Sequence, residues 1–150
     1  MKNILVLLIA TILLACGGGS DGADGKSGKP DLRPKGIGEV KKVTLNDPLD
    51  QNMVNRGRAI YDMKCAACHK LSAKRVVGPG WAGLTDKRRP EWIMNMITNV
   101  EVMLDKDPVA RKLLEECLTR MPNQNVSIGD ARDILEFIYQ NELDQKANEG

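Results

Sequence analysis

From about residue 52 onward, apolar residues recur three and four positions apart, which is the spacing of one face of an α-helix. No segment shows the alternation of apolar and polar residues that is typical of a strand. The pattern predicts four helices, which begin near Asn52, Pro90, Pro108 and Ser127. We therefore expect an all-α fold.

Local signals support three of these helix starts. Pro90 suits the first helical turn, where its missing N–H has no partner to lose. Asp107 followed by Pro108 is typical of an N-cap and a first-turn proline. Ser127 with Asp130 three positions later indicates a capping box at the start of the last helix.

The first fifteen residues predict an export signal. Lys2 supplies a positive charge, and Ile4–Leu14 is an uninterrupted apolar run. This run is shorter than the about 20 residues that span a bilayer. It ends in Leu-Leu-Ala before Cys16, which resembles the lipobox of bacterial lipoproteins, where the cysteine is acylated. A plain secretory signal with a coincidental cysteine is the alternative.

Composition divides the rest of the chain. Residues 16–45 are rich in Gly, Ser, Asp, Lys and Pro, so we expect a lipidated Cys16 and a flexible linker that cannot offset the entropy of ordering. Residues 46–146 are expected to form one domain, and residues 147–150 a short tail. The chain contains only one Phe, two Tyr and two Trp, so a large apolar cofactor would help to fill the core.

The strongest chemical signal is the sequence Cys65-Ala-Ala-Cys68-His69. Two thiols about one helical turn apart can add to the two vinyl groups of haem, and the adjacent histidine then faces the iron. The motif therefore predicts one covalent haem c, bound through Cys65 and Cys68, with His69 as the proximal iron ligand. A thioredoxin-like site would need a βαβ pattern, which is absent. A zinc site would need four ligands, which is more than the motif provides. A disulfide between the two cysteines would leave the adjacent His69 unexplained.

His69 is the only histidine in the chain, so a second histidine ligand is excluded. The sixth coordination position is then held by methionine, lysine or another weak donor, or it is open. Met121 is the best candidate, because Pro122 forces it out of helical geometry into a loop between helices. Met103 is the next. A thioether opposite an imidazole raises the reduction potential and blocks access to the iron, which favours electron transfer.

On these features the chain resembles a small single-haem class I cytochrome c over about residues 52–143. The similarity rests on the helix that enters the Cys-x-x-Cys-His motif, the Gly-Pro-Gly sequence at 78–80, the Met-Pro pair at Met121 and a closing helix. The resemblance implies a cytochrome c fold, in which about four helices wrap around one covalently bound haem.

The resemblance also implies roles for individual residues. The carbonyl of Pro79 would accept a hydrogen bond from the free ring N–H of His69 and make the imidazole a better donor; that Pro79 only shapes a turn is the alternative. The first and last helices would cross tightly, with Gly57 and Tyr61 against residues 135–139. Candidates for contact with the haem propionates are Trp81, Arg88 and Arg89.

The net charge of +2 favours neither nucleic acid nor an extremely acidic partner. Its distribution is more informative. Residues 64–89 contain seven cations and one anion, whereas residues 90–146 contain six cations and eleven anions. The basic stretch beside the cysteine motif predicts a docking surface for redox partners with acidic surfaces, or it serves solubility alone.

Together these features predict a single-electron carrier of a cell-envelope respiratory chain, not an enzyme. The lipid at Cys16 would tether it to a membrane, with the haem domain in the periplasm. Tethered cytochromes of this kind often supply a terminal reductase or oxidase, so nitrous oxide reductase is one candidate partner. A peroxidase or ligand sensor with an open sixth site is the first alternative, and a lipoprotein whose two cysteines handle thiols is the second.

Overall fold

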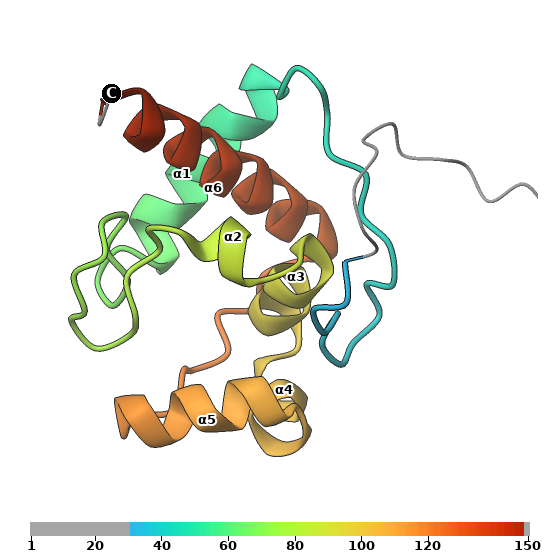
Figure 1. The fold of residues 1–150 in the computed structure, drawn as a ribbon, viewed down its shortest axis with the longest axis vertical. Coiled ribbons are helices and arrows are strands. Elements are labelled where there is room, and N and C mark those ends of the chain that lie inside the picture. The colour runs from blue at the N-terminus through green and yellow to red at the C-terminus, as the bar shows by residue number, and fades with distance from the viewer. Residues whose placement is uncertain (1–30, 149–150) are drawn as a thin grey trace, which may run out of the picture. The chain divides into compact units, whose positions relative to one another are not determined.

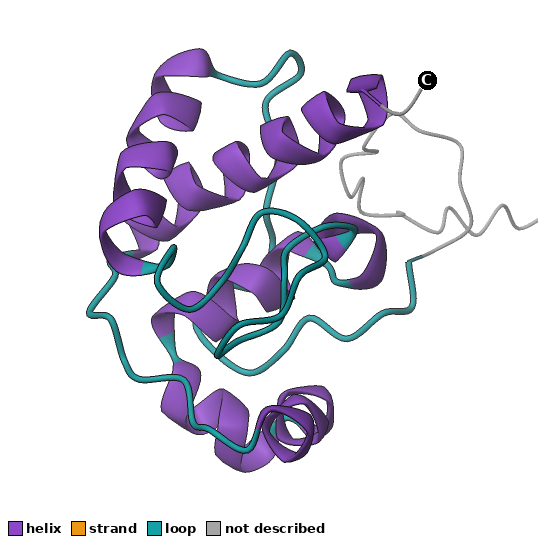
Figure 2. Cartoon of the chain, turned by 90° about the vertical axis from the view of Figure 1, so that its left-hand side faces the viewer, coloured by secondary structure: helices purple, strands orange, loops and turns teal. Residues whose placement is uncertain are grey.

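The computed structural model describes residues 31–148, which form helices joined by loops (Figures 1 and 2). The helices are α1 (Gln51–Lys64), α2 (Leu84–Lys87), α3 (Pro90–Thr98), α4 (Val100–Lys106), α5 (Pro108–Cys117) and α6 (Ile128–Asn148). No strand occurs in this part of the chain, which confirms the all-α class. Six helices replace the expected four, because α2 forms between the first two predicted helices and Asn99 separates α3 from α4.

Helices α1 and α6 cross at close range, and this crossing holds the first and last parts of the fold together (Figure 1). At Gly57 of α1, a Cβ atom would lie 2.1 Å from the Asp133 carbonyl oxygen and 2.9 Å from the Phe137 Cβ. Beside this contact, Arg56 donates two hydrogen bonds to the Asp133 carboxylate, at 2.6 and 2.8 Å. The Tyr61 and Phe137 rings pack with centroids 5.4 Å apart. The predicted contact of a small residue with aromatic residues is confirmed.

The predicted caps form as the sequence indicates. The Asp107 carboxylate accepts hydrogen bonds from the backbone N–H groups of Val109 and Ala110, at 3.0 and 2.9 Å, and so begins α5. The same oxygen accepts the indole N–H of buried Trp92 at 3.1 Å, which ties α5 to α3. The Ser127 hydroxyl accepts the N–H of Asp130 at 3.0 Å and begins α6.

The segment 32–45 packs on the helical domain, so the prediction of a flexible linker as far as residue 45 is wrong for this part. The Asn95 side chain of α3 is fully buried. Both its amide NH₂ group and its amide oxygen form hydrogen bonds with this segment. Its NH₂ group donates to the carbonyls of Lys35 and Val40, at 3.1 and 3.0 Å, and its oxygen accepts the N–H of Val40 at 3.1 Å. The Asn95 side chain thus satisfies buried backbone groups of the segment. A polar segment can therefore pack on the domain although it contains few apolar residues.

The ends of the domain also differ from the predicted boundaries. Helix α6 continues to Asn148, two residues into the predicted tail. The predicted signal peptide and Cys16 lie outside the described residues. Within residues 31–148, no helix combines the length and the apolar character needed to cross a membrane.

We predict that Gly57→Ala destabilises the domain by about 1–3 kcal/mol, because the added methyl group would overlap the Asp133 carbonyl of α6. Gly129→Ala is a matched control, since a Cβ there meets only the Ser127 hydroxyl at 3.7 Å. This second change is expected to leave the stability unchanged or slightly raised, since Gly129 is in the first turn of α6 and the added methyl group would make only an ordinary van der Waals contact. Thermal unfolding of both variants measures the difference, and equal midpoints would contradict the close crossing.

Candidate functional site

The two motif cysteines lie in a turn that continues directly from α1. Cys65 is the C-cap of α1, and its N–H donates to the Tyr61 carbonyl at 2.8 Å. The N–H groups of Cys68 and His69 both donate back to the Cys65 carbonyl, at 3.0 and 2.9 Å. The Tyr61 hydroxyl donates to the His69 carbonyl at 2.7 Å, so α1 holds both ends of the motif.

The His69 imidazole is oriented by a hydrogen bond from its Nδ1 to the Pro79 carbonyl, 2.8 Å away. A carbonyl only accepts, so Nδ1 carries the proton and Nε2 keeps its lone pair. Burial lowers the pKa of His69 below its ordinary value of 6.5, and the hydrogen bond to Pro79 acts in the opposite direction. The ring is therefore neutral at neutral pH, which is the form that binds a metal.

Two glycines allow the loop that carries Pro79 to approach the motif closely. At Gly78, a Cβ would lie 2.3 Å from Cε1 of His69, and at Gly80 it would lie 2.1 Å from the Ser72 carbonyl oxygen. The Gly78 N–H donates to the Cys68 carbonyl at 3.0 Å, which fixes the loop against the motif. Any side chain at position 78 would push the imidazole away from its present position.

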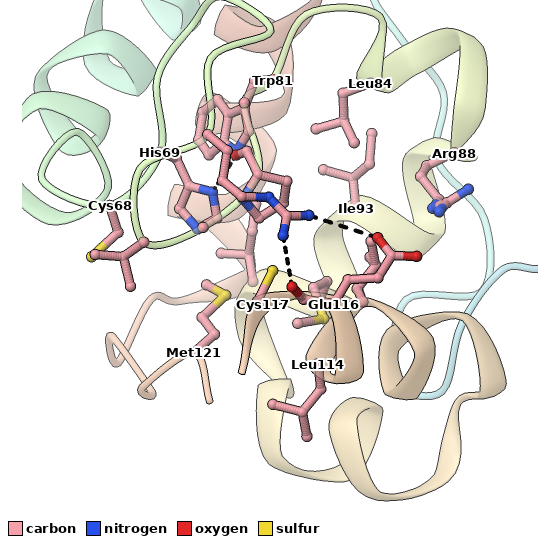
Figure 3. Close-up of a pocket in the computed structure, with 18 of the residues that line it drawn as sticks. Cys68, His69, Trp81, Leu84, Arg88, Ile93, Leu114, Glu116, Cys117 and Met121 are labelled. Atoms are coloured by element: carbon pink, nitrogen blue, oxygen red, sulfur yellow. Dashed lines mark hydrogen bonds and ion pairs between the residues drawn. The ribbon is translucent and has the colours of Figure 1, made fainter. Parts of the chain in front are cut away.

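A cavity of about 530 Å³ opens beside His69 and lies within the size range of cofactor sites (Figure 3). Its walls are mostly apolar and come from the motif, the following loop, helices α2 to α6 and the loop after α5. The lining includes Cys68, His69, Pro79, Trp81, Leu84, Ile93, Met96, Ile97, Leu104, Leu113, Leu114, Cys117 and Met121. A pair of thiols, a free imidazole nitrogen and an apolar cavity are the donor set and surroundings that covalent haem requires.

The environment of Cys65 disfavours thiol exchange. Burial raises the pKa of its thiol to about 11, since desolvation penalises the thiolate. Reactive cysteines of thiol-handling proteins have lowered pKa values, because the thiolate is the attacking form. The alternative of a thiol-handling lipoprotein therefore loses support. A group of three or more metal-binding side chains, as a zinc site requires, is not found within residues 31–148.

Met121 lies in the loop after α5 and lines the cavity, as the sequence predicts (Figure 3). Met103, the second candidate, is fully buried elsewhere, and its sulfur accepts the N–H of Ile37 at 3.0 Å. Met96 of α3 also lines the cavity, although its helical position indicates a packing role. Two methionines are thus available to a group bound in the cavity, and only Met121 is in a loop.

The three residues predicted near the propionates have different surroundings. Trp81 is buried, lines the cavity and packs against Tyr61 with ring centroids 4.9 Å apart. Arg88 also lines the cavity, and its guanidinium lies over the Trp92 ring at 5.2 Å. Arg89 is not among the lining residues and forms hydrogen bonds with the buried Glu91 carboxylate, at 3.1 and 3.2 Å. The structure thus brings two of the three to the cavity.

The contribution of α5 to the cavity is not evident from the sequence. Leu113, Leu114 and Cys117 of α5 line the cavity, and Cys117 is half-buried. Periodicity identifies the apolar face of α5, but it does not reveal which part of the fold that face covers.

The fold and the site define a small helical protein with a Cys-x-x-Cys-His motif beside an apolar cavity of cofactor size. The chain belongs to the cytochrome c family, since the family model described as cytochrome c matches residues 54–142. Members of this family carry one covalent haem c, and the predicted cofactor is thereby confirmed. Cys68 and His69 line the cavity in which it fits, and Cys65 lies in the same turn, three residues before Cys68.

Solved structures support the assignment. Cytochrome c from Rhodothermus marinus is 34% identical, with a TM-score of 0.70, over 72% of this chain and 92% of that chain. The engineered cytochrome c Rma TDE from Rhodothermus marinus is 33% identical, with a TM-score of 0.67, over 71% and 91%. A cytochrome c domain from Pseudomonas putida, at 20% identity, has a TM-score of 0.53 over 61% and 92%, which supports the fold alone. Comparison with curated protein sequences found no match.

We predict that Gly78→Ala lowers both the haem content and the stability of the protein, because the methyl group would occupy space now filled by the His69 ring. The expected destabilisation is about 1–3 kcal/mol. Haem staining of the purified protein and thermal unfolding followed by haem absorption measure the two effects. Unchanged haem content together with an unchanged midpoint would contradict this packing of the ring.

Proposed function

We propose that this cytochrome c is a single-electron carrier whose iron is held by His69 and Met121. The family generally carries electrons through haem, and this is the function of the domain. The observation that supports the ligand pair is that His69 and Met121 come from different loops and line the same cavity. A haem held by these two residues would gain or lose an electron with little rearrangement of the chain.

The protein residues of the site orient the haem ligand and exclude water. When bound, haem supplies the one-electron couple. The Pro79 carbonyl fixes the His69 ring and keeps its proton on Nδ1, which strengthens Nε2 as a donor. Apolar residues of α3 and α5 line the cavity and lower its polarity. A dry surrounding of this kind raises the potential of a haem, since it disfavours the more highly charged oxidised state.

We predict that Met121→Ala abolishes the weak sulfur-to-iron absorption band of the oxidised protein, at the red edge of the visible spectrum. Met96→Ala is the matched control, since it removes the other thioether that lines the cavity, and the band should persist. The absorption spectra of the two purified variants decide the assignment. Loss of the band in the Met96 variant, with retention in the Met121 variant, would assign the ligand to α3.

The alternative of a peroxidase or ligand sensor requires an open sixth position. A peroxidase with a distal histidine is excluded, because His69 is the only histidine of the chain. Binding of carbon monoxide to the reduced wild-type protein, seen as a spectral shift, would favour an open site over the electron carrier. No shift is expected while Met121 holds the sixth position.

We propose further that the domain works in the periplasm, anchored to a membrane by lipid on Cys16. The support is the sequence Leu-Leu-Ala-Cys after a charged residue and an apolar run. Acyl chains hold a protein firmly at a membrane when two or more are present. The residues between Cys16 and the packed segment that begins at residue 32 would then serve as the tether.

The proposed partners are redox proteins with acidic docking surfaces, such as a terminal reductase or oxidase; nitrous oxide reductase is one candidate. The support is the excess of cations beside the site. Lys64, Lys70 and Lys74 are exposed, and they flank the motif and its loop. Charges of one sign around a redox site raise the encounter rate with partners of opposite sign.

We predict that salt slows oxidation of the reduced protein by an anionic oxidant, hexacyanoferrate(III), because ions screen the attraction to these lysines. Replacing both Lys70 and Lys74 by glutamate should lower the rate at low salt and remove most of the salt dependence. Lys42→Glu is the control, since this exposed lysine is not among the cavity residues. Stopped-flow kinetics give the rates. A double variant that behaves like the control would contradict the steering.

A further inference from the structure

Arg75 joins two walls of the haem cavity. It lies in the loop between the motif and Pro79, and both Arg75 and Glu116 of α5 line the cavity. Its Nη1 donates to the Glu116 carbonyl oxygen at 2.7 Å, and its Nη2 lies 3.7 Å from the Glu116 carboxylate (Figure 3). One side chain therefore connects the loop that orients His69 with the helix that precedes Met121.

The end of α5 lacks a positive charge of its own. The carbonyl groups of a helix C-terminus carry partial negative charge, which nearby cations stabilise. In α5 the last turn contains no basic residue, and Glu115 and Glu116 add two negative charges. Arg75 supplies the missing cation from another part of the chain and bonds a carbonyl of this last turn.

Little apolar packing holds the chain immediately after α5. Leu118 is the C-cap, with a left-handed backbone (φ 58°), and its side chain is 88% exposed. The loop that follows has two further polar ties to other helices. Arg120 pairs with Asp105 of α4 at 2.9 Å, and Lys64 of α1 donates to the Gln124 carbonyl at 3.0 Å. The bond from Arg75 differs from these because it starts in the loop that leads to Pro79 and ends on the last turn of α5 itself.

We propose that Arg75 is a positioning residue, which clamps the end of α5 and thereby keeps Met121 in place against competing small ligands. This inference rests on the proposed function, in which Met121 is the sixth ligand. The clamp acts through the backbone of α5, so its main acceptor is the Glu116 carbonyl. The ion pair with the Glu116 carboxylate is exposed and contributes less.

The test is displacement of the thioether from the oxidised haem protein by added imidazole, followed by loss of the sulfur-to-iron band. Arg75→Ala is expected to raise the apparent affinity for imidazole about threefold to tenfold, since the end of α5 loosens. Lys74→Ala removes one positive charge from the same loop and should leave the affinity unchanged. Glu116→Gln should have a small effect, because the backbone acceptor remains.

A second variant and a second measurement make the outcome decisive. Arg75→Lys keeps the positive charge but loses the planar guanidinium group, so its affinity for imidazole should lie between those of the wild-type protein and Arg75→Ala. This variant replaces Arg75→Ala in the test if the alanine variant does not fold. Hydrogen exchange at the last turn of α5 should be faster in the Arg75 variants. Faster exchange with unchanged imidazole affinity would reduce Arg75 to a structural residue and overturn the inference.

The two proposals fail in different ways. Equal imidazole affinities in the Arg75 and Lys74 variants, with a normal band in the wild-type protein, would refute the clamp alone. Absence of the band from the wild-type protein would refute Met121 as a ligand, and the clamp with it. The wild-type spectrum therefore separates the outcomes before any variant is compared.

Discussion

The hydrogen bond between the His69 ring and the Pro79 carbonyl is the interaction on which the site depends. It sets the proton on Nδ1, leaves the lone pair of Nε2 free to bind a metal, and holds the loop against the motif. Gly78 makes this geometry accessible, since the loop passes where a Cβ would overlap the ring. Burial then favours the neutral imidazole. The chain contains a single histidine, so all of these contacts orient one imidazole.

The rest of the fold supports this imidazole from one side and covers the cavity from the other. Helix α1 leads into the motif and is locked by its crossing with α6, while α3 and α5 supply apolar walls. A cavity of this size would cost a small domain packing contacts if nothing filled it. A large apolar cofactor restores them, and this suits a chain with so few aromatic residues. Electron transfer and stability therefore depend on the same cavity.

The sequence predicts those features of the fold and site that depend on neighbouring residues. Asp107 and Ser127 cap helices because their side chains bond N–H groups two or three positions away. The motif places two thiols and an imidazole in one turn for the same reason. Arg88 and Arg89, by contrast, are adjacent in the chain, yet one lines the cavity and the other bonds Glu91. Their local sequence does not predict this difference, because the partner of each arginine depends on how the helices pack.

By itself, then, the sequence determined the helical class, the caps, the covalent haem motif and the choice of family, since each rests on short-range spacing. Only the tertiary structure decided that residues 32–45 belong to the domain and that α5 covers the cavity. It also decided that Arg75 reaches the end of that helix. These contacts join positions 41 to 60 residues apart. Such pairings arise when separate helices pack against one another, and neither hydropathy nor local propensity encodes them.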